Sequence, residues 1–516
     1  MGGDEAAGLR ASAAAARAPA PLAAERGAAA ARAPAPFPAT PPPPPSARAL
    51  QLRVRALGLA FFFLFASYIA VQLLQTTVNA DVGYICNLAV YLCFAASSLT
   101  APFVVARLGP SRCLGASAVI YVLQMVANID PLPAPLLASC AATGLAGGTL
   151  WIGQAAFVGS AAGAYAVAAG KSLSDASSEL NSAFFFAFQV SGCIGTIFAS
   201  VLMLTAPGAR GALFGVLTAS GATGALLLAA LAPPDSPGEA VLLWSPWARR
   251  ADELAKGEVG ADAAAAPPAA ASAPPASAGA FVPLAVSAPP ASAAASAPPA
   301  ASASAAASTP PAASAPLASP APSAPMPLSA FAHFVASQPR LVALAPLFFA
   351  MGAFQAVGFS TLTGAVVVPQ LGAGWVGFVG AAYSASASAF VLALPLVTLR
   401  PRIGRRWAVA LAAAIWAVTL ACLLAWVAAY DPRRDPPPRA AAFAALFAAS
   451  CALGAGDGAM QALMSATLQT WWPARVPSAL AFMRSCMALG TATVAGVGAR
   501  AEPGVRECPT TRKSRS

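Results

Sequence analysis

Charged residues are scarce in this chain. Only 9% of its 516 residues are Asp, Glu, Lys or Arg, and 58% are hydrophobic. Soluble domains carry about 25% charged residues, so the composition excludes an ordinary soluble domain and indicates a membrane protein. The net charge of +11 does not indicate nucleic-acid binding. The Lys and Arg residues lie in loops and tails beside apolar segments, where membrane topology already explains them.

Metal-binding and acid–base residues are also few. The chain has a single histidine, His333, and none of its nine cysteines forms a CxxC pair. We therefore expect no metal site and no cofactor, and we interpret the cysteines within apolar segments as small hydrophobic residues. An intramembrane enzyme would need paired acids or a nucleophile with its base. The apolar segments offer neither arrangement, so we expect no enzyme.

What the chain does contain is eleven apolar stretches of about twenty residues each. At about 1.5 Å per residue, such a stretch crosses the roughly 30 Å hydrocarbon core as a helix. The predicted fold class is an all-α membrane protein with about eleven transmembrane helices, six before a long linker and five after it. Two groups of spans separated by a long connector are typical of a two-bundle transporter fold.

The predicted organisation has five parts. Ala/Pro-rich segments without apolar residues to bury are expected to be disordered, and the linker has an Ala/Pro/Ser composition. An organelle transit peptide is the alternative for the N-terminal tail. The parts are a disordered tail (1–56), a six-helix bundle (57–232), a disordered linker (233–339), a five-helix bundle (340–500) and a basic tail (501–516).

The distribution of Lys and Arg predicts the orientation. With the N-terminus inside, about fifteen of these residues face the cytoplasm, and Arg210, Arg433, Arg434 and Arg439 face outside. Cytoplasmic loops are enriched in Lys and Arg, so the N-terminus and the long linker are expected to be cytoplasmic. Plasma membrane, endomembranes and a plastid envelope are all compatible with this topology.

Two charges fall inside the spans. Asp457 lies in the tenth span and Arg484 in the eleventh. A charge at membrane depth is costly, and it is a functional candidate by default. Counted from the turn between the two spans, the residues differ in depth by about 6 Å. One hypothesis is that they form an ion pair. The alternative is that Arg484 extends to the inner interface beside Trp471 and Trp472.

Other polar and small residues recur at helical spacing. Gln461 follows Asp457 on one helix face, Gln189 lies on a polar face of the fifth span, and Trp151 and Gln154 lie in the fourth. These faces are predicted either to line a central cavity or to make ordinary interhelical hydrogen bonds. Small residues that allow close helix packing are Gly144, Gly148, Ser191, Gly195, Gly454 and Gly458.

Short basic turns occur at matching places in the two groups. Arg107 and Gly109 follow the second span of the first group, and Arg402 and Gly404 follow the second span of the second group. Such cytoplasmic turns are expected if the two groups are structural repeats.

Several runs resemble the Unc-ninety-three family, ion-channel regulatory proteins of the major facilitator superfamily. The runs are Leu74–Asn79, Tyr91–Leu99, Leu150–Gln154, Ala183–Gly192, Gly454–Asp457 with Gln461, and Ala481–Gly490. The resemblance implies a major-facilitator-like fold of six plus six helices, so a twelfth helix is expected to be missing here. Ala106 occupies a position where the superfamily usually has Asp, which argues against proton-coupled gating through that loop.

The resemblance implies that the protein acts as an accessory or trafficking partner of a potassium channel or other membrane protein, with a role in potassium homeostasis. Its partners would be the lipid bilayer and an ion-channel or receptor subunit. The alternative is a major-facilitator-type transporter that moves a small solute or cation, using Asp457 and the neighbouring polar residues.

Overall fold

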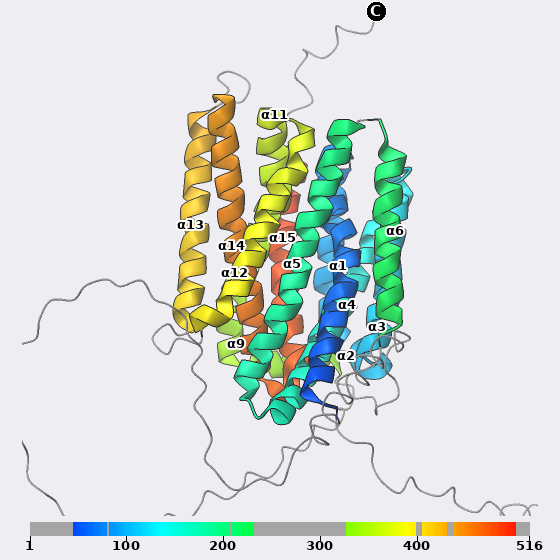
Figure 1. The fold of residues 1–516 in the computed structure, drawn as a ribbon, viewed down its shortest axis with the longest axis vertical. Coiled ribbons are helices and arrows are strands. Elements are labelled where there is room, and N and C mark those ends of the chain that lie inside the picture. The colour runs from blue at the N-terminus through cyan, green and yellow to red at the C-terminus, as the bar shows by residue number, and fades with distance from the viewer. Residues whose placement is uncertain are drawn as a thin grey trace, which may run out of the picture. The chain divides into compact units, whose positions relative to one another are not determined.

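The computed structural model describes residues 45–79, 82–206, 208–231, 327–398, 405–430 and 437–501. These ranges are helical and contain no strand (Figure 1). Eleven of the helical segments are long and apolar enough to cross a membrane, which confirms the predicted all-α membrane fold. The first six are α1 (Ala47–Val78), α2 (Gly83–Leu108), α3 (Pro110–Ala127), α4 (Pro133–Ala169), α5 (Leu173–Thr205) and α6 (Arg210–Ala229).

The second group begins with a composite span over Pro339–Leu371. It joins α9 (Pro339–Ala343), α10 (Ala345–Ala356), a π-helix η1 (Val357–Val367) and α11 (Val368–Leu371). The short α8 (Leu328–Ala336) precedes it, and the 3₁₀ turns η2 (Ala373–Trp375) and η3 (Pro473–Arg475) precede α12 and α15. The other spans are α12 (Val376–Thr398), α13 (Arg405–Ala429), α14 (Arg439–Trp471) and α15 (Val476–Ala501).

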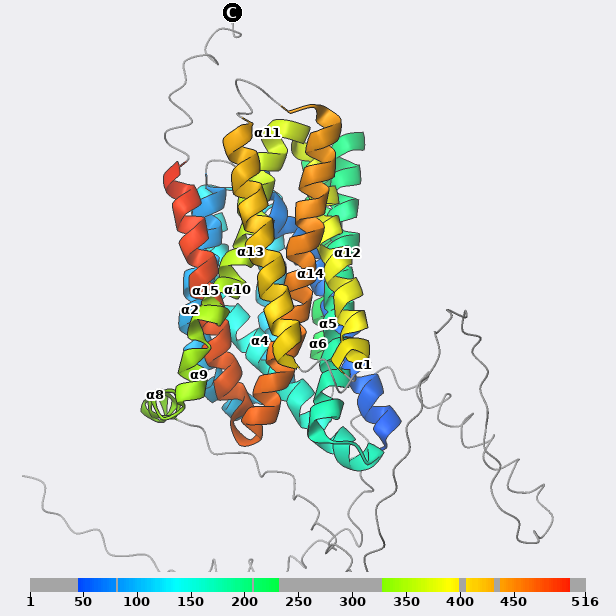
Figure 2. The same ribbon diagram turned by 90° about the vertical axis from the view of Figure 1, so that its left-hand side faces the viewer.

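Two pairs of helices join the groups, and in each pair the second span of one group packs on the fifth span of the other. The fifth span of the first group, α5, packs along the second span of the second group, α12. In turn α2, the second span of the first group, packs along α15, the fifth span of the second (Figure 2). This exchange of second and fifth spans is what a two-fold relation between repeated bundles would produce.

Several helices are longer than the apolar stretches predicted. α1 begins at Ala47, inside the tail expected to be disordered, because Ser46 caps it and Leu50 and Val54 are buried. α4 and α5 have 37 and 33 residues, well beyond the stretches of about twenty residues expected from the sequence. They meet at Gly170, whose φ of 61° forms the helix end.

A polar cluster stabilises this extension. Gln51 donates to Tyr165 and to Glu179, and Lys171 forms a 2.7 Å ion pair with Glu179. Hydrogen bonding to the Glu179 carboxylate raises the pKa of Lys171. The cluster therefore ties α1, α4 and α5 together beside the turn.

The end of the predicted linker is also helical. Residues 327–339 include α8, whose Phe331 and Phe334 are buried. The apolar side chains explain why this part differs from the Ala/Pro/Ser sequence before it. Residues 1–44, 232–326 and 502–516, together with Arg402 and Gly404, lie outside the described residues. Gly109, with φ of 82°, forms the turn after α2, and the exposed Arg107 lies over the Phe103 ring.

Small residues bring the helices of the first group close together. A Cβ at Gly144 would lie 2.2 Å from the Val90 carbonyl oxygen, and α2 also passes directly over Gly148. At Gly195 a Cβ would lie 1.8 Å from the carbonyl oxygen of Ala66 on α1. Ser191, fully buried on α5, donates to the Phe188 carbonyl one turn earlier.

We expect Gly195→Ala to destabilise the protein by about 1–3 kcal/mol, because the added methyl forces α5 away from α1. Gly163→Ala is the matched control, since a Cβ at this position of α4 would meet no atom of a neighbouring helix within 4 Å. That change should leave stability unchanged or raise it by up to about 1 kcal/mol. Thermal unfolding of the detergent-solubilised protein measures both. Equal melting temperatures for the two variants would contradict the close α1–α5 contact.

Candidate functional site

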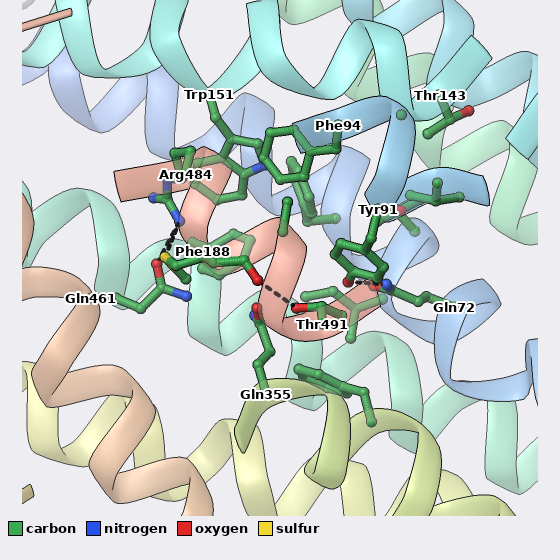
Figure 3. A pocket seen from close by; sticks show the side chains of 18 of the residues that line it. Gln72, Tyr91, Phe94, Thr143, Trp151, Phe188, Gln355, Gln461, Arg484 and Thr491 are labelled. Carbon is green, nitrogen blue, oxygen red and sulfur yellow. Dashed lines mark hydrogen bonds between the residues drawn. The ribbon is translucent and has the colours of Figure 1, made fainter. Parts of the chain in front are cut away.

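A buried cavity lies between the two groups of helices (Figure 3). Its walls come from α1, α2, α3, α4 and α5 on one side and from α10, η1, α14 and α15 on the other. Its volume is about 60 Å³, room for roughly four water molecules at about 15 Å³ each. The polar and charged side chains that line it are Tyr68, Gln72, Tyr91, Tyr121, Thr143, Gln189, Gln355, Asp457, Gln461, Arg484 and Thr491.

Glycines position Asp457 on α14. A Cβ at Gly454 would lie 2.0 Å from the Tyr383 carbonyl oxygen, and one at Gly458 would lie 2.5 Å from that of Ala387. Both contacts are with α12, so α14 and α12 approach to backbone distance at this level. The small residues before and after Asp457 therefore fix the helix while its carboxylate reaches the cavity.

The Asp457 carboxylate is buried and hydrogen-bonded. Its side chain is 2% exposed, and its two oxygens accept from the Gln189 and Gln461 amides, each at 3.4 Å. Tyr383 on α12 makes a further hydrogen-bonding contact with it. Since Gln189 belongs to α5, the carboxylate connects helices from both groups.

Arg484 lies across the cavity on α15 and is 5% exposed. Its guanidinium carbon is 4.3 Å from the centroid of the Trp151 ring, a cation–π arrangement. Its Nη1 donates to Gln461 Oε1 at 2.8 Å and lies 3.8 Å from Met487 Sδ. Trp151 thus covers one side of the guanidinium, and Gln461 accepts from its edge.

The direct Asp457–Arg484 ion pair predicted from the sequence is wrong. Among the described residues, Lys171 and Glu179 form an ion pair at 2.7 Å, whereas no contact of 4.0 Å or less joins Asp457 and Arg484. Gln461 connects the two charges instead, with its oxygen toward Arg484 and its nitrogen toward Asp457. The alternative is wrong too, because the guanidinium lies against Trp151 rather than beside Trp471 and Trp472.

The other predicted residues divide between cavity and packing. Trp151 and Gln189 line the cavity, whereas Gln154 is 2% exposed and does not line it. Further along α5, a Cβ at Gly192 would lie 2.5 Å from Ser384 Oγ on α12. The polar face of α5 therefore reaches the cavity only at Gln189 and otherwise packs between the groups.

Several residues of the cavity were not predicted. Gln72 donates to the Tyr91 hydroxyl, Thr143 Oγ1 is buried without a hydrogen-bond partner, and Gln355 lines the wall beside the π-helix. Gln72 and Gln355 are glutamines within apolar spans, and this sequence signal could have identified them. The π-helix had no clear signal. Such turns often occur at functional sites, and here η1 places Phe359 in the cavity wall.

The described residues contain no group of three or more His, Cys, Asp or Glu side chains that could hold a metal ion. The cavity offers one carboxylate and one guanidinium, with amide, hydroxyl and aromatic groups around them. Chemically, this set can bind a small polar ligand through hydrogen bonds and two opposite charges.

Solved structures of the nucleoside transporter NupG and of a mutant form of it align with 87% of this chain. Both are 14% identical to it, over 90% and 91% of their own chains, with TM-scores of 0.46 and 0.49. Scores below 0.5 establish neither fold nor function. No family model matches the chain.

Two curated proteins are similar in sequence. A potassium channel regulatory protein, unc-93 of Caenorhabditis elegans, is 32% identical over 96 residues, or 18% of this chain and 14% of the relative. UNC93-like protein 3 of Arabidopsis thaliana is 32% identical over 103 residues, or 20% of this chain and 22% of the relative. The chain thus matches less than a quarter of the length of either relative. These matches confirm the resemblance to Unc-93-like proteins that was predicted from the sequence of this multi-span membrane protein.

Proposed function

We propose that the protein is an accessory or trafficking partner of a potassium channel or another membrane protein. The observation that carries this proposal is the 32% identity, over 96 residues, to unc-93, whose name describes a potassium channel regulatory protein. One way for an accessory protein to bind its partner is through a surface within the bilayer that another transmembrane segment contacts.

The outer face of α13 offers such a surface. In the first group, the third span α3 is covered by α6, which also packs on α1. In the second group, α13 has no equivalent cover among the described helices and packs mainly on α14. Its exposed face carries Ala410, Ala414, Ala417 and Ala421 at helical spacing. Small residues in register allow close contact between helices in lipid.

A second candidate function is a carrier for a small solute or cation. The specific observation that favours it is the cavity between the two groups, where Asp457 and Arg484 face a shared space. In transporters built from repeats, substrate sites lie near the midplane between the bundles.

For the accessory role, we expect Ala417→Leu to lower recovery of the partner at least tenfold, because the larger side chain prevents close helix contact. Tagged full-length protein is cross-linked in its native membranes and purified, and co-purifying proteins are identified by mass spectrometry. Ala96→Leu, at an exposed alanine of α2, is the matched control and should retain the partner. Recovery of no channel or receptor subunit with the unsubstituted protein would contradict the accessory role.

For the carrier role, we expect both Asp457→Asn and Asp457→Glu to reduce tracer uptake or change cellular potassium content. Asn removes the negative charge, and Glu, which is one methylene longer, moves the carboxylate within a small cavity. Asp130→Asn, at an exposed position, is the control and should have no effect. Uptake and potassium are compared at equal amounts of protein in the membrane. The carrier role is excluded if neither quantity differs between the two Asp457 variants and the unsubstituted protein.

A further inference from the structure

Arg484 has more hydrogen-bond donors than the protein satisfies. A guanidinium carries several N–H groups in a planar fork and cannot accept a hydrogen bond. In the described part of the chain, its one oxygen acceptor is Gln461 Oε1, at 2.8 Å from Nη1. Trp151 covers one face of the group and Met487 Sδ lies beside Nη1. Arg484 lines the cavity, where an oxyanion could accept from its remaining N–H groups.

Asp457 presents the complementary need. Its carboxylate is 2% exposed, and the donors that reach it are all uncharged: the Tyr383 side chain and the Gln189 and Gln461 amides, the two amides at 3.4 Å. The two amide contacts are longer than the 2.7–3.2 Å typical of N–H···O hydrogen bonds. A closer, positively charged donor on the cavity side would satisfy the carboxylate better.

The Gln461 amide is the acceptor for Arg484 and also a donor to Asp457. Arg484 can only donate and an ionised Asp457 can only accept, so the orientation of the Gln461 amide is determined. Its oxygen and nitrogen are roughly 2.2 Å apart, so Arg484 Nη1 and Asp457 Oδ1 lie at most about 8.4 Å from each other. A molecule that offers a carboxylate to Arg484 and an ammonium to Asp457 would have the same polarity as this amide. Unlike the amide, it would carry full charges.

The rest of the cavity limits the size and net charge of such a molecule. Room for roughly four water molecules admits only the smallest organic solutes. Thr143 Oγ1, on a fully buried side chain without a hydrogen-bond partner, lines the same space and could bind a further polar atom. Because Asp457 and Arg484 both face the cavity, a lone cation or a lone anion would be attracted by one and repelled by the other.

We propose that the cavity binds a small zwitterion of the α-amino-acid class, with its carboxylate on Arg484 and its ammonium on Asp457. The ligand displaces the Gln461 amide from both groups and leaves it free to turn aside. This site goes beyond the accessory role. If the second candidate function holds, the site names the class of its substrate, but binding itself does not require transport.

Purified full-length protein in detergent tests the proposal with glycine as the probe. We expect glycine to raise the melting temperature in a saturable way, since a ligand that binds only the folded state stabilises it. Acetate and methylammonium, each carrying one half of the zwitterion, should give much smaller shifts at equal ionic strength. Arg484→Gln and Asp457→Asn should each weaken glycine binding by more than tenfold.

The decisive variant is Gln461→Ala. Without the competing amide, glycine should bind with a roughly tenfold lower Kd, because two hydrogen bonds no longer have to be broken. Gln154→Ala, at a buried glutamine outside the cavity, is the control and should bind like the unsubstituted protein. Absence of a glycine effect in both the unsubstituted protein and Gln461→Ala would overturn the proposal. A shift with acetate or methylammonium as large as that with glycine would also overturn it. None of these readouts depends on channel association or uptake.

Discussion

Gln461 connects the two charges that this protein keeps at membrane depth. Its amide accepts from Arg484 and faces Asp457, so that neither charge is left without a partner although they do not touch. Burial of a charge in a low-dielectric region is costly unless hydrogen bonds and an opposite charge compensate it. Gln461 meets that requirement in part, because it gives each charged group one amide contact, and a cavity that both groups line remains beside it.

The cavity depends on how the two groups of helices meet. Close α5–α12 and α2–α15 contacts join the groups. At Gly377 on α12, a Cβ would lie 2.2 Å from the Thr196 carbonyl oxygen on α5, so the absence of a side chain allows these two helices to approach. Asp457 then receives one hydrogen bond from its own helix and one from Gln189 in the other group. A change in the distance between the groups would therefore alter the environment of Asp457 directly. The packing between the two groups of helices and the geometry of the polar site therefore depend on each other.

The spans and the two charges could be predicted from the sequence, because long apolar stretches and charges within them are strong signals. Helix ends were predicted less well. The apolar pattern weakens at the start of α1 and on both sides of the turn at Gly170. The helices extend into these regions because Gln51, Tyr165 and Glu179 hydrogen-bond to one another there. The direct ion pair was predicted from depth along the helix axes, and depth does not give the lateral distance between helices. Tyr383 and Thr143 join the site through tertiary contacts that no local pattern records.

A double-mutant cycle on Asp457 and Arg484 tests the central claim most directly, because it measures whether the two buried charges stabilise each other through this site. The melting temperature is measured for Asp457→Asn, Arg484→Met and the double variant. We predict that each single change destabilises the protein. The double variant should lose less stability than the sum of the losses in the two single variants, with a coupling free energy of about 1–3 kcal/mol. Additive effects would mean that the charges do not interact and would contradict the account.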